Sequence, residues 1–273
     1  YISDDNYSLR KISFNPLFWI DRLIMRRRLR KVFAACDIVY TISENQKEYL
    51  RQRFGDKFKV LTKYAEFDKS NKPAGFRPHA PLRMLYTGNL GSGRYSSLCL
   101  IAKALRQVNA HEQRIVFDIY TSTVLSEKLR SRLNTAETTL HDAVSFEKVL
   151  ELQRRADILV HVEGLSLKER LDVAHSFSTK IVDYLQQCKP IFVVGKDDCA
   201  SIRYFIDNDS GIVAQNYDEI VRKLTAIAAS PVILADYAEK AWTCGEKNHR
   251  KSIHQEALKN DLLNVVKQTN KTR

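Results

Sequence analysis

The sequence predicts an α/β protein with a doubly wound, Rossmann-like parallel sheet, and three features of its 273 residues support this. From residue 83 onward, strand-like and helix-like segments alternate. Several of the strands are nearly unbroken apolar runs, such as 158–160 and 191–194, which is typical of strands buried on both faces. A polar stretch with three prolines, 69–81, separates this region from an earlier one and predicts a linker.

The segment before the linker, 1–68, predicts the tail of a second α/β unit. Its expected elements are a helix at 17–35, a strand at 37–42, a helix at 43–55 and a strand at 57–62. Ser43 and Gln46 form a capping box at the start of the second helix. Earlier strands of such a unit are absent and the chain begins with Tyr1 rather than Met, so we expect that an N-terminal part has been removed.

The region after the linker predicts one doubly wound domain over 82–230, followed by C-terminal helices over 231–273. The expected strands are 83–87, 114–121, 157–161, 190–194 and 211–214. The expected helices are 95–108, 125–133, 147–155, 179–187, 198–206, one from 216, one from 231, and a last one at 249–268.

Composition excludes several classes of protein. The longest apolar runs are five residues, against about 20 for a membrane-spanning helix. The net charge is +12, and residues 1–70 hold 15 Lys and Arg against 9 Asp and Glu, so a polyanionic partner is expected at that end. The five cysteines are widely spaced, which predicts small core residues in a reducing, cytoplasmic compartment.

A glycine-rich loop follows the first strand of the expected domain. Gly88, Gly91 and Gly93 lie within six residues of a glycine-poor chain, which indicates close approach of the backbone to something. Arg94 starts the next helix, where a cation opposes the helix dipole. A bound phosphate would remove that conflict, because backbone N–H groups and the guanidinium would hold it together. The alternative is a plain connector with a solvated arginine.

The same loop also fits a dinucleotide fingerprint weakly. Gly91, Gly93 and Ser96 give G-x-G-x-x-S, and Asp118, expected to end the following strand, could receive a ribose hydroxyl. An NAD-dependent oxidoreductase is therefore an alternative function. A basic nucleic-acid-binding module is another, although aromatic residues are not interleaved with the basic ones in any recognisable motif, so we expect no nucleic-acid partner.

A second loop places a cation and a carboxylate on one helical face. Lys180 lies in the first turn of an expected helix, and Asp183 and Tyr184 follow at i+3 and i+4. A lysine for phosphate and a carboxylate for ribose hydroxyls would grip a nucleotide. The alternative is an ordinary surface salt pair between Lys180 and Asp183.

Four blocks of sequence together resemble glycosyltransferase family 4. They are 37–44, 84–94, 156–160 and the most specific one, 178–190. The resemblance covers about 30–245 and implies the GT-B fold of two facing Rossmann-like domains. It also implies sugar transfer from a nucleotide-sugar donor, UDP- or GDP-linked, without metal or other cofactor. The donor would bind the C-terminal domain, and the final helix would cross back onto the N-terminal part.

The resemblance also implies roles for individual residues. The implied donor-phosphate contacts are Gly88, Asn89, Gly91, Arg94 and Lys180, the ribose or base contacts are Asp183, Tyr184, Phe146 and Glu147, and the catalytic residues are His175 and Asp183. His175 stands where the family has a glutamate. Because the acceptor domain is incomplete, we expect a donor-binding fragment that is inactive alone. The implied acceptor is a glycan or lipid-linked glycan of cell-surface polysaccharide synthesis.

Three further patterns have competing interpretations. The 17–35 helix combines Phe18 and Trp19 with basic residues, which fits an anionic membrane surface at the inner face of the cell membrane or simply a charged outer face. The triplet 207–209 has a metal-binding D-x-D pattern but fits a turn better. His249 and His254 are spaced wrongly for zinc ligands on a helix and are expected to be solvated.

Overall fold

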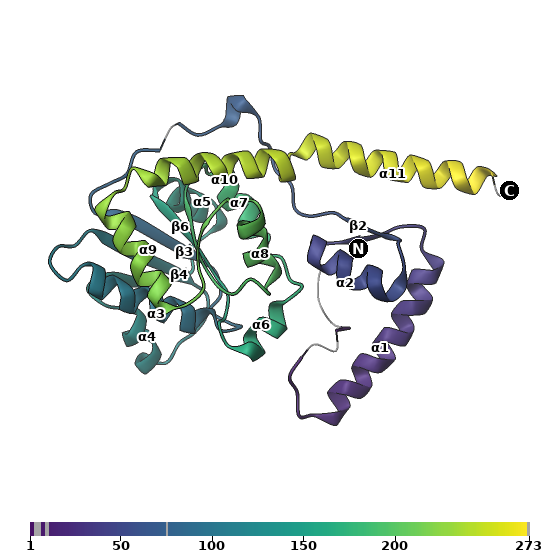
Figure 1. The fold of residues 1–273 in the computed structure, drawn as a ribbon, viewed down its shortest axis with the longest axis horizontal. Helices are drawn as coiled ribbons and strands as arrows, with labels where there is room; N and C mark the ends of the chain where they lie inside the picture. The colour runs from purple at the N-terminus through teal and green to yellow at the C-terminus, as the bar shows by residue number, and fades with distance from the viewer. Residues whose placement is uncertain (3–6, 9–10, 75, 272–273) are drawn as a thin grey trace.

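A six-stranded parallel sheet lies at the centre of the larger of two parts in the computed structural model, which describes residues 1–2, 7–8, 11–74 and 76–271 (Figure 1). Its strands are β3 (Leu82–Thr87), β4 (Ile115–Thr121), β5 (Thr138–Asp142), β6 (Ile158–Val162), β7 (Ile191–Val194) and β8 (Ile212–Ala214). The order is β5-β4-β3-β6-β7-β8, with Met84 of β3 opposite Ile158 of β6. The strand order therefore reverses between β3 and β6, which is the topological switch point of a doubly wound sheet.

Helices cover both faces of this sheet, as the sequence predicts. They are α3 (Arg94–Val108), α4 (Glu127–Leu133), α5 (Phe146–Arg155), α6 (Leu167–Val173), α7 (Lys180–Gln186), α8 (Ala200–Asp207), α9 (Tyr217–Ala229) and α10 (Ile233–His249). Alternate strand residues enter two separate cores: Met84 and Val160 pack in the core that includes α3 and α9. Leu159 packs in the other, with Ile181 of α7 and Trp242 of α10.

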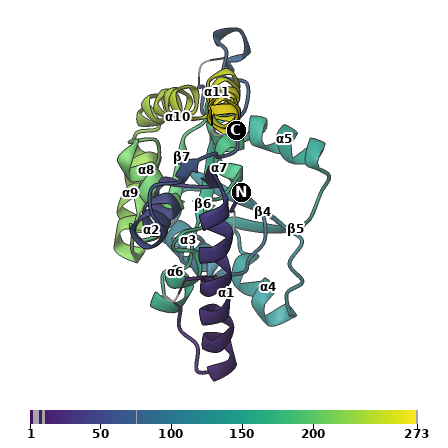
Figure 2. The same cartoon turned by 90° about the vertical axis from the view of Figure 1, so that its right-hand side faces the viewer.

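A small parallel unit precedes the sheet. It consists of α1 (Pro16–Ala35), β1 (Val39–Thr41), α2 (Glu44–Phe54) and β2 (Phe58–Val60), and its core includes Phe33, Leu50 and Phe58. Ser43 caps α2, since its side chain accepts a hydrogen bond from the backbone of Gln46. In the described parts of the expected linker, 69–74 and 76–81, the structure has one 3₁₀ turn, η1 (Lys69–Asn71). Figures 1 and 2 show this unit beside the sheet, on the side of α6 and α8.

The C-terminal helices connect the two parts. A break at Arg250 separates α10 from α11 (Lys251–Lys271), and Ala65 hydrogen-bonds on both sides of it, to the carbonyl of His249 and the N–H of Lys251. Farther along α11, Asp261 accepts a hydrogen bond of 3.0 Å from the Tyr40 hydroxyl of β1. Within the described ranges, no helix is both long and apolar enough to cross a bilayer.

Candidate functional site

The switch point between β3 and β6 gathers charged side chains from three loops. Arg94 follows the loop after β3, Glu163 follows β6 directly, and Lys180 begins α7. In open α/β sheets, ligands bind in the crevice beyond the carboxyl ends of the strands at such a point. Lys180, Arg94 and Glu163 are called the switch-point cluster below.

Lys180 lies against the carboxyl end of β3. Its Nζ donates a hydrogen bond of 2.7 Å to the carbonyl of Thr87 and lies 4.9 Å from the centre of the Tyr86 ring. Burial, together with the nearby charge of Arg94, lowers the pKa of Lys180 to about 8, and the Glu163 and Asp183 carboxylates oppose that shift. The ammonium is thus held in place and poorly solvated, which strengthens its attraction for an added anion.

Arg94 is paired with a carboxylate that the sequence reasoning did not single out. Its Nη2 lies 3.0 Å from Oε2 of Glu163, and its Nη1 donates to Oδ1 of Asn89 at 2.8 Å. Glu163 is only 2% exposed and also accepts from the Ser201 hydroxyl. Burial raises the pKa of Glu163, while Arg94 acts against the rise. The unfavourable placement of Arg94 at a helix start is therefore offset by Glu163 in this structure.

The glycine loop is tight at two of its three glycines. Gly88 has φ +150°, and a Cβ there would lie 2.2 Å from Nζ of Lys180. Gly93 has φ +80°, and a Cβ there would lie 2.2 Å from the carboxyl carbon of Glu169. Gly91 has no such restriction, because the nearest atom to an added Cβ is 3.7 Å away. Gly88 and Gly93 are thus required by the backbone and by close side chains.

Asp183 and Tyr184 point to different environments. Oδ1 of Asp183 lies 2.5 Å from Nζ of Lys63, which belongs to the segment after β2. Tyr184 is 1% exposed, with its hydroxyl 3.4 Å from Oγ1 of Thr87, so its ring lies in the core and not on the surface of the crevice. The alternative of a surface pair between Lys180 and Asp183 is not what the structure contains, because each has another partner.

The remaining predicted residues lie outside the switch-point cluster. Phe146 and Glu147 begin α5, after the edge strand β5, and both are exposed. Hydrogen bonds from its own backbone N–H and from the Ser145 hydroxyl lower the pKa of Glu147. His175 lies in the turn between α6 and α7, 2% exposed, with its ring 4.4 Å from that of Tyr49. The structure does not bring these three together with Lys180.

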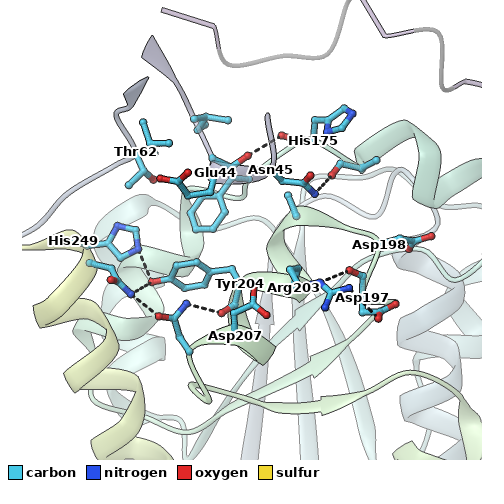
Figure 3. Close-up of a pocket in the computed structure, with 18 of the residues that line it drawn as sticks. Glu44, Asn45, Thr62, His175, Asp197, Asp198, Arg203, Tyr204, Asp207 and His249 are labelled. Carbon is cyan, nitrogen blue, oxygen red and sulfur yellow. Dashed lines mark hydrogen bonds and ion pairs between the residues drawn. The ribbon is translucent and has the colours of Figure 1, made fainter. Parts of the chain in front are cut away.

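A cavity lies between the N-terminal unit and α8 (Figure 3). Its volume is about 840 Å³. Its wall includes both apolar surface and many residues with polar or charged side chains: Ser43, Glu44, Asn45, Thr62, His175, Asp197, Asp198, Arg203, Tyr204, Asp207, Asn208, Asn248, His249 and His254. We call it the acidic cavity. Among the site residues that the sequence predicts, His175 lines this cavity.

A buried hydrogen-bond network supports one side of the acidic cavity. Nδ1 of His249 lies 2.9 Å from the carbonyl of Lys63, and its Nε2 lies 2.8 Å from the Tyr204 hydroxyl. A carbonyl can only accept, so Nδ1 carries the proton and Nε2 accepts from Tyr204. The prediction that His249 is solvated is therefore wrong: the side chain is 1% exposed, and burial lowers its pKa to about 4.

Comparison with known proteins identifies the fold. No protein-family model matches the chain, and no curated protein does. Among solved structures, a TarM mutant from S. aureus, crystallised with UDP and other ligands, has a TM-score of 0.68 at 12% identity and covers 95% of this chain and 49% of its own. HepE from Anabaena, in complex with UDP and glucose, has a TM-score of 0.68 at 10% identity and covers 96% and 70%.

The pneumococcal O-GlcNAc transferase GtfA, in complex with UDP and GlcNAc, has a TM-score of 0.64 at 13% identity and covers 97% of this chain and 52% of its own. The chain has the fold of the GT-B glycosyltransferases. It spans about half the length of TarM and GtfA.

The structure does not support two of the alternative interpretations, the dinucleotide fingerprint with Asp118 and the metal-binding triplet 207–209. Asp118, expected at the end of its strand, lies within β4, which continues to Thr121, and pairs with His141 of β5 at 2.7 Å. It is therefore not placed for a dinucleotide ribose. Asp207 ends α8 and Asp209 pairs with Lys240 at 2.8 Å. In the part of the chain that the structure describes, no group of three or more His, Cys, Asp or Glu could hold a metal ion.

One signal in the sequence could have indicated Glu163. A carboxylate that directly follows an apolar strand, and precedes a glycine, falls at the carboxyl end of a buried strand. Its charge then needs a partner, since a lone buried carboxylate is costly. The acidic residues of the cavity gave no comparable signal, because Asp197, Asp198 and Asp207 flank or end one helix and only the fold brings Glu44 of α2 to them.

Proposed function

We propose that this chain is the donor-binding part of a glycosyltransferase that transfers a sugar from a UDP- or GDP-sugar. The observation that carries the proposal is the pair of cations, Lys180 and Arg94, held beside the glycine loop at the switch point of a GT-B sheet. The TM-scores to UDP-bound structures add to it. Glycosyl transfer releases a nucleoside diphosphate, whose charge two fixed cations would stabilise.

In this proposal, Gly88, Asn89 and Gly91 receive the donor diphosphate, and Asp183 binds the ribose once Lys63 releases it. Glu163 acts as a positioning residue for Arg94, with which it shares two hydrogen bonds. Phe146 and Glu147 contact the base from the start of α5. Reaction without a metal ion, the catalytic roles of His175 and Asp183, and an acceptor in cell-surface polysaccharide synthesis remain parts of the same proposal.

Calorimetric titration with UDP, GDP and NAD tests this function. We expect saturable binding of UDP or GDP and at least tenfold weaker binding by Lys180→Ala. A matched control is Lys259→Ala, an exposed lysine on α11, which should bind like the original chain. NAD binding that is insensitive to Lys180→Ala would contradict the proposal, and so would the absence of UDP and GDP binding at millimolar concentration.

The exposed face of α1 favours a contact with an anionic membrane surface. Leu17, Ile20 and Ile24 are exposed at helical spacing, and exposed Arg28 and Lys31 continue the same face. Co-sedimentation with vesicles of phosphatidylcholine alone, or with added phosphatidylserine, tests this contact. We expect recovery only with phosphatidylserine, and its loss in Arg28→Glu but not in Arg106→Glu, an exposed residue of α3. Equal recovery with both vesicles would contradict it.

A further inference from the structure

Two buried titratable side chains lie side by side at the carboxyl end of β6. His161 belongs to β6 and Glu163 directly follows it, so both side chains point to the same face of the sheet. They are 4% and 3% exposed, and Nε2 of His161 lies 3.6 Å from Oε1 of Glu163. That distance is too long for a hydrogen bond, and Nε2 has no hydrogen-bond partner among the described residues. His161 and Glu163 are called the buried pair below.

Two cations face the buried pair from different helices. Arg94, at the start of α3, donates hydrogen bonds to both carboxylate oxygens of Glu163. Lys180, at the start of α7, acts on both members of the pair through its charge. Burial, together with the charges of Lys180 and Arg94, holds the pKa of His161 well below its ordinary value. The other groups that face the pair are Ser201 and Phe205 of α8, Cys199 just before α8, and Tyr86 of β3.

A diphosphate bound between the two cations would reverse their effect on the buried pair. In this structure, Arg94 and Lys180 oppose the rise that burial causes in the pKa of Glu163. The negative charge of a bound diphosphate would offset both cations, and it would also repel the buried carboxylate directly. A charge within about 4–6 Å changes a pKa by about one to three pH units. The pKa values of both members of the pair would therefore rise when the anion binds.

We propose that the buried pair takes up one proton from solvent when a diphosphate binds at the switch-point cluster. The proton binds the Glu163 carboxylate and is shared with Nε2 of His161, while the other nitrogen of that ring keeps its own proton. A short movement closes the 3.6 Å gap to a hydrogen bond, so a buried nitrogen gains the partner that it lacks. The added positive charge offsets part of the diphosphate charge. This inference rests on the proposed function, which places the diphosphate beside Arg94 and Lys180.

Calorimetry of the whole chain in buffers of different ionisation enthalpy counts the protons taken up for each UDP bound. At pH 6 Lys180, with a pKa of about 8, is already protonated and contributes no uptake. We expect the original chain to take up about half a proton or more per UDP beyond what Glu163→Gln takes up. The titration of UDP itself is the same for both chains, so it cancels in this difference. The matched control is Glu112→Gln, in an exposed pair with Arg114, which should behave like the original chain.

A second variant and a spectroscopic signal separate proton uptake from a purely structural role. His161→Phe keeps a ring beside Phe205 but removes the nitrogen that would share the proton. We expect it to lose at least half of the extra uptake at pH 6, and to change UDP affinity less than threefold at pH 8, where the pair holds no extra proton. Infrared difference spectra should show the C=O band of a protonated carboxylic acid upon UDP addition to the original chain. That band should be absent in Glu163→Gln.

The outcomes separate this proposal from the proposed function. If UDP binds with the same proton count in the original chain and in Glu163→Gln, the role of the buried pair is overturned while the donor function stands. An equal loss of uptake in Glu112→Gln would overturn it as well. If neither UDP nor GDP binds, the donor function fails, and inorganic pyrophosphate becomes the probe. Uptake upon pyrophosphate binding that is lost in Glu163→Gln would still support the buried pair. Binding without such uptake, or no binding at 10 mM, would overturn it.

Discussion

Replacing Gly88 by alanine tests the geometry of the glycine loop most sharply. At φ +150° an L-residue is strained, by about 1–3 kcal/mol. The new Cβ would also lie 2.2 Å from Nζ of Lys180, far inside van der Waals contact, so the ammonium must leave its hydrogen bond with Thr87. Losing a hydrogen bond to a charged group costs about 1.5–3 kcal/mol before water replaces it. We expect Gly88→Ala to lower the free energy of unfolding by about 2–4 kcal/mol.

Urea denaturation followed by circular dichroism measures this change, and two other glycines are controls. Gly91→Ala should change the free energy of unfolding by less than about 0.5 kcal/mol, since no atom lies closer than 3.7 Å. Gly55→Ala, at φ +92° with nothing within 4 Å, carries strain alone. The excess of Gly88→Ala over Gly55→Ala therefore reports the contact with Lys180. A Gly88→Ala variant as stable as the original chain, or one matched by Gly91→Ala, would refute this reasoning.

Three other predictions concern charge. Lys180 has a pKa of about 8 and attracts phosphate only when protonated, so UDP affinity should fall as pH rises from 7 to 9, and calorimetry of Lys180→Ala should show no such fall. The folded pKa of His249, about 4, lies below its ordinary 6.5, so the unfolded chain takes up the proton first. Urea denaturation should therefore show stability lost as pH falls from 6.5 toward 4, and less loss in His249→Gln. Glu163→Gln should lower the free energy of unfolding by about 1–3 kcal/mol, because it leaves Arg94 without its carboxylate partner. Glu112→Gln, which removes an exposed ion pair with Arg114, should change it very little in the same urea denaturation.

The architecture followed from local sequence signals because those signals act over a few residues. Apolar runs such as Ile191–Val194 and caps such as Ser43 and Asn216 are found where the spacing predicts them. Two elements were missed for different reasons. The edge strand β5, Thr138–Asp142, has only one large apolar residue, Leu140, and so gives a weak local signal. The helix α6 is only seven residues long, but Ser166 and Glu169 form a capping box that could have indicated its start.

The site was harder to predict than the fold because its contacts span long distances in sequence. The loops and Lys180 could be placed at the carboxyl edge from the strand pattern alone. That Arg94 faces Glu163, 69 residues away, depends on β3 and β6 being neighbours, which a single sequence does not reveal. The same holds for Asp183, whose partner Lys63 comes from the N-terminal unit. The acidic cavity likewise forms only when α2, α8 and the end of α10 meet.

Amide NMR of the chain during UDP titration tests the donor site most directly. The nine glycines give a small set of amide signals, and three of these residues, Gly88, Gly91 and Gly93, lie in the glycine loop after β3. We predict that the amides of Gly88, Gly91 and Gly93 shift upon UDP addition, while those of Gly55 and Gly211, outside the loop, stay unchanged. Shifts confined to the side-chain amides of the acidic cavity, or no shift in the loop at saturating UDP, would contradict a diphosphate site at Lys180 and Arg94.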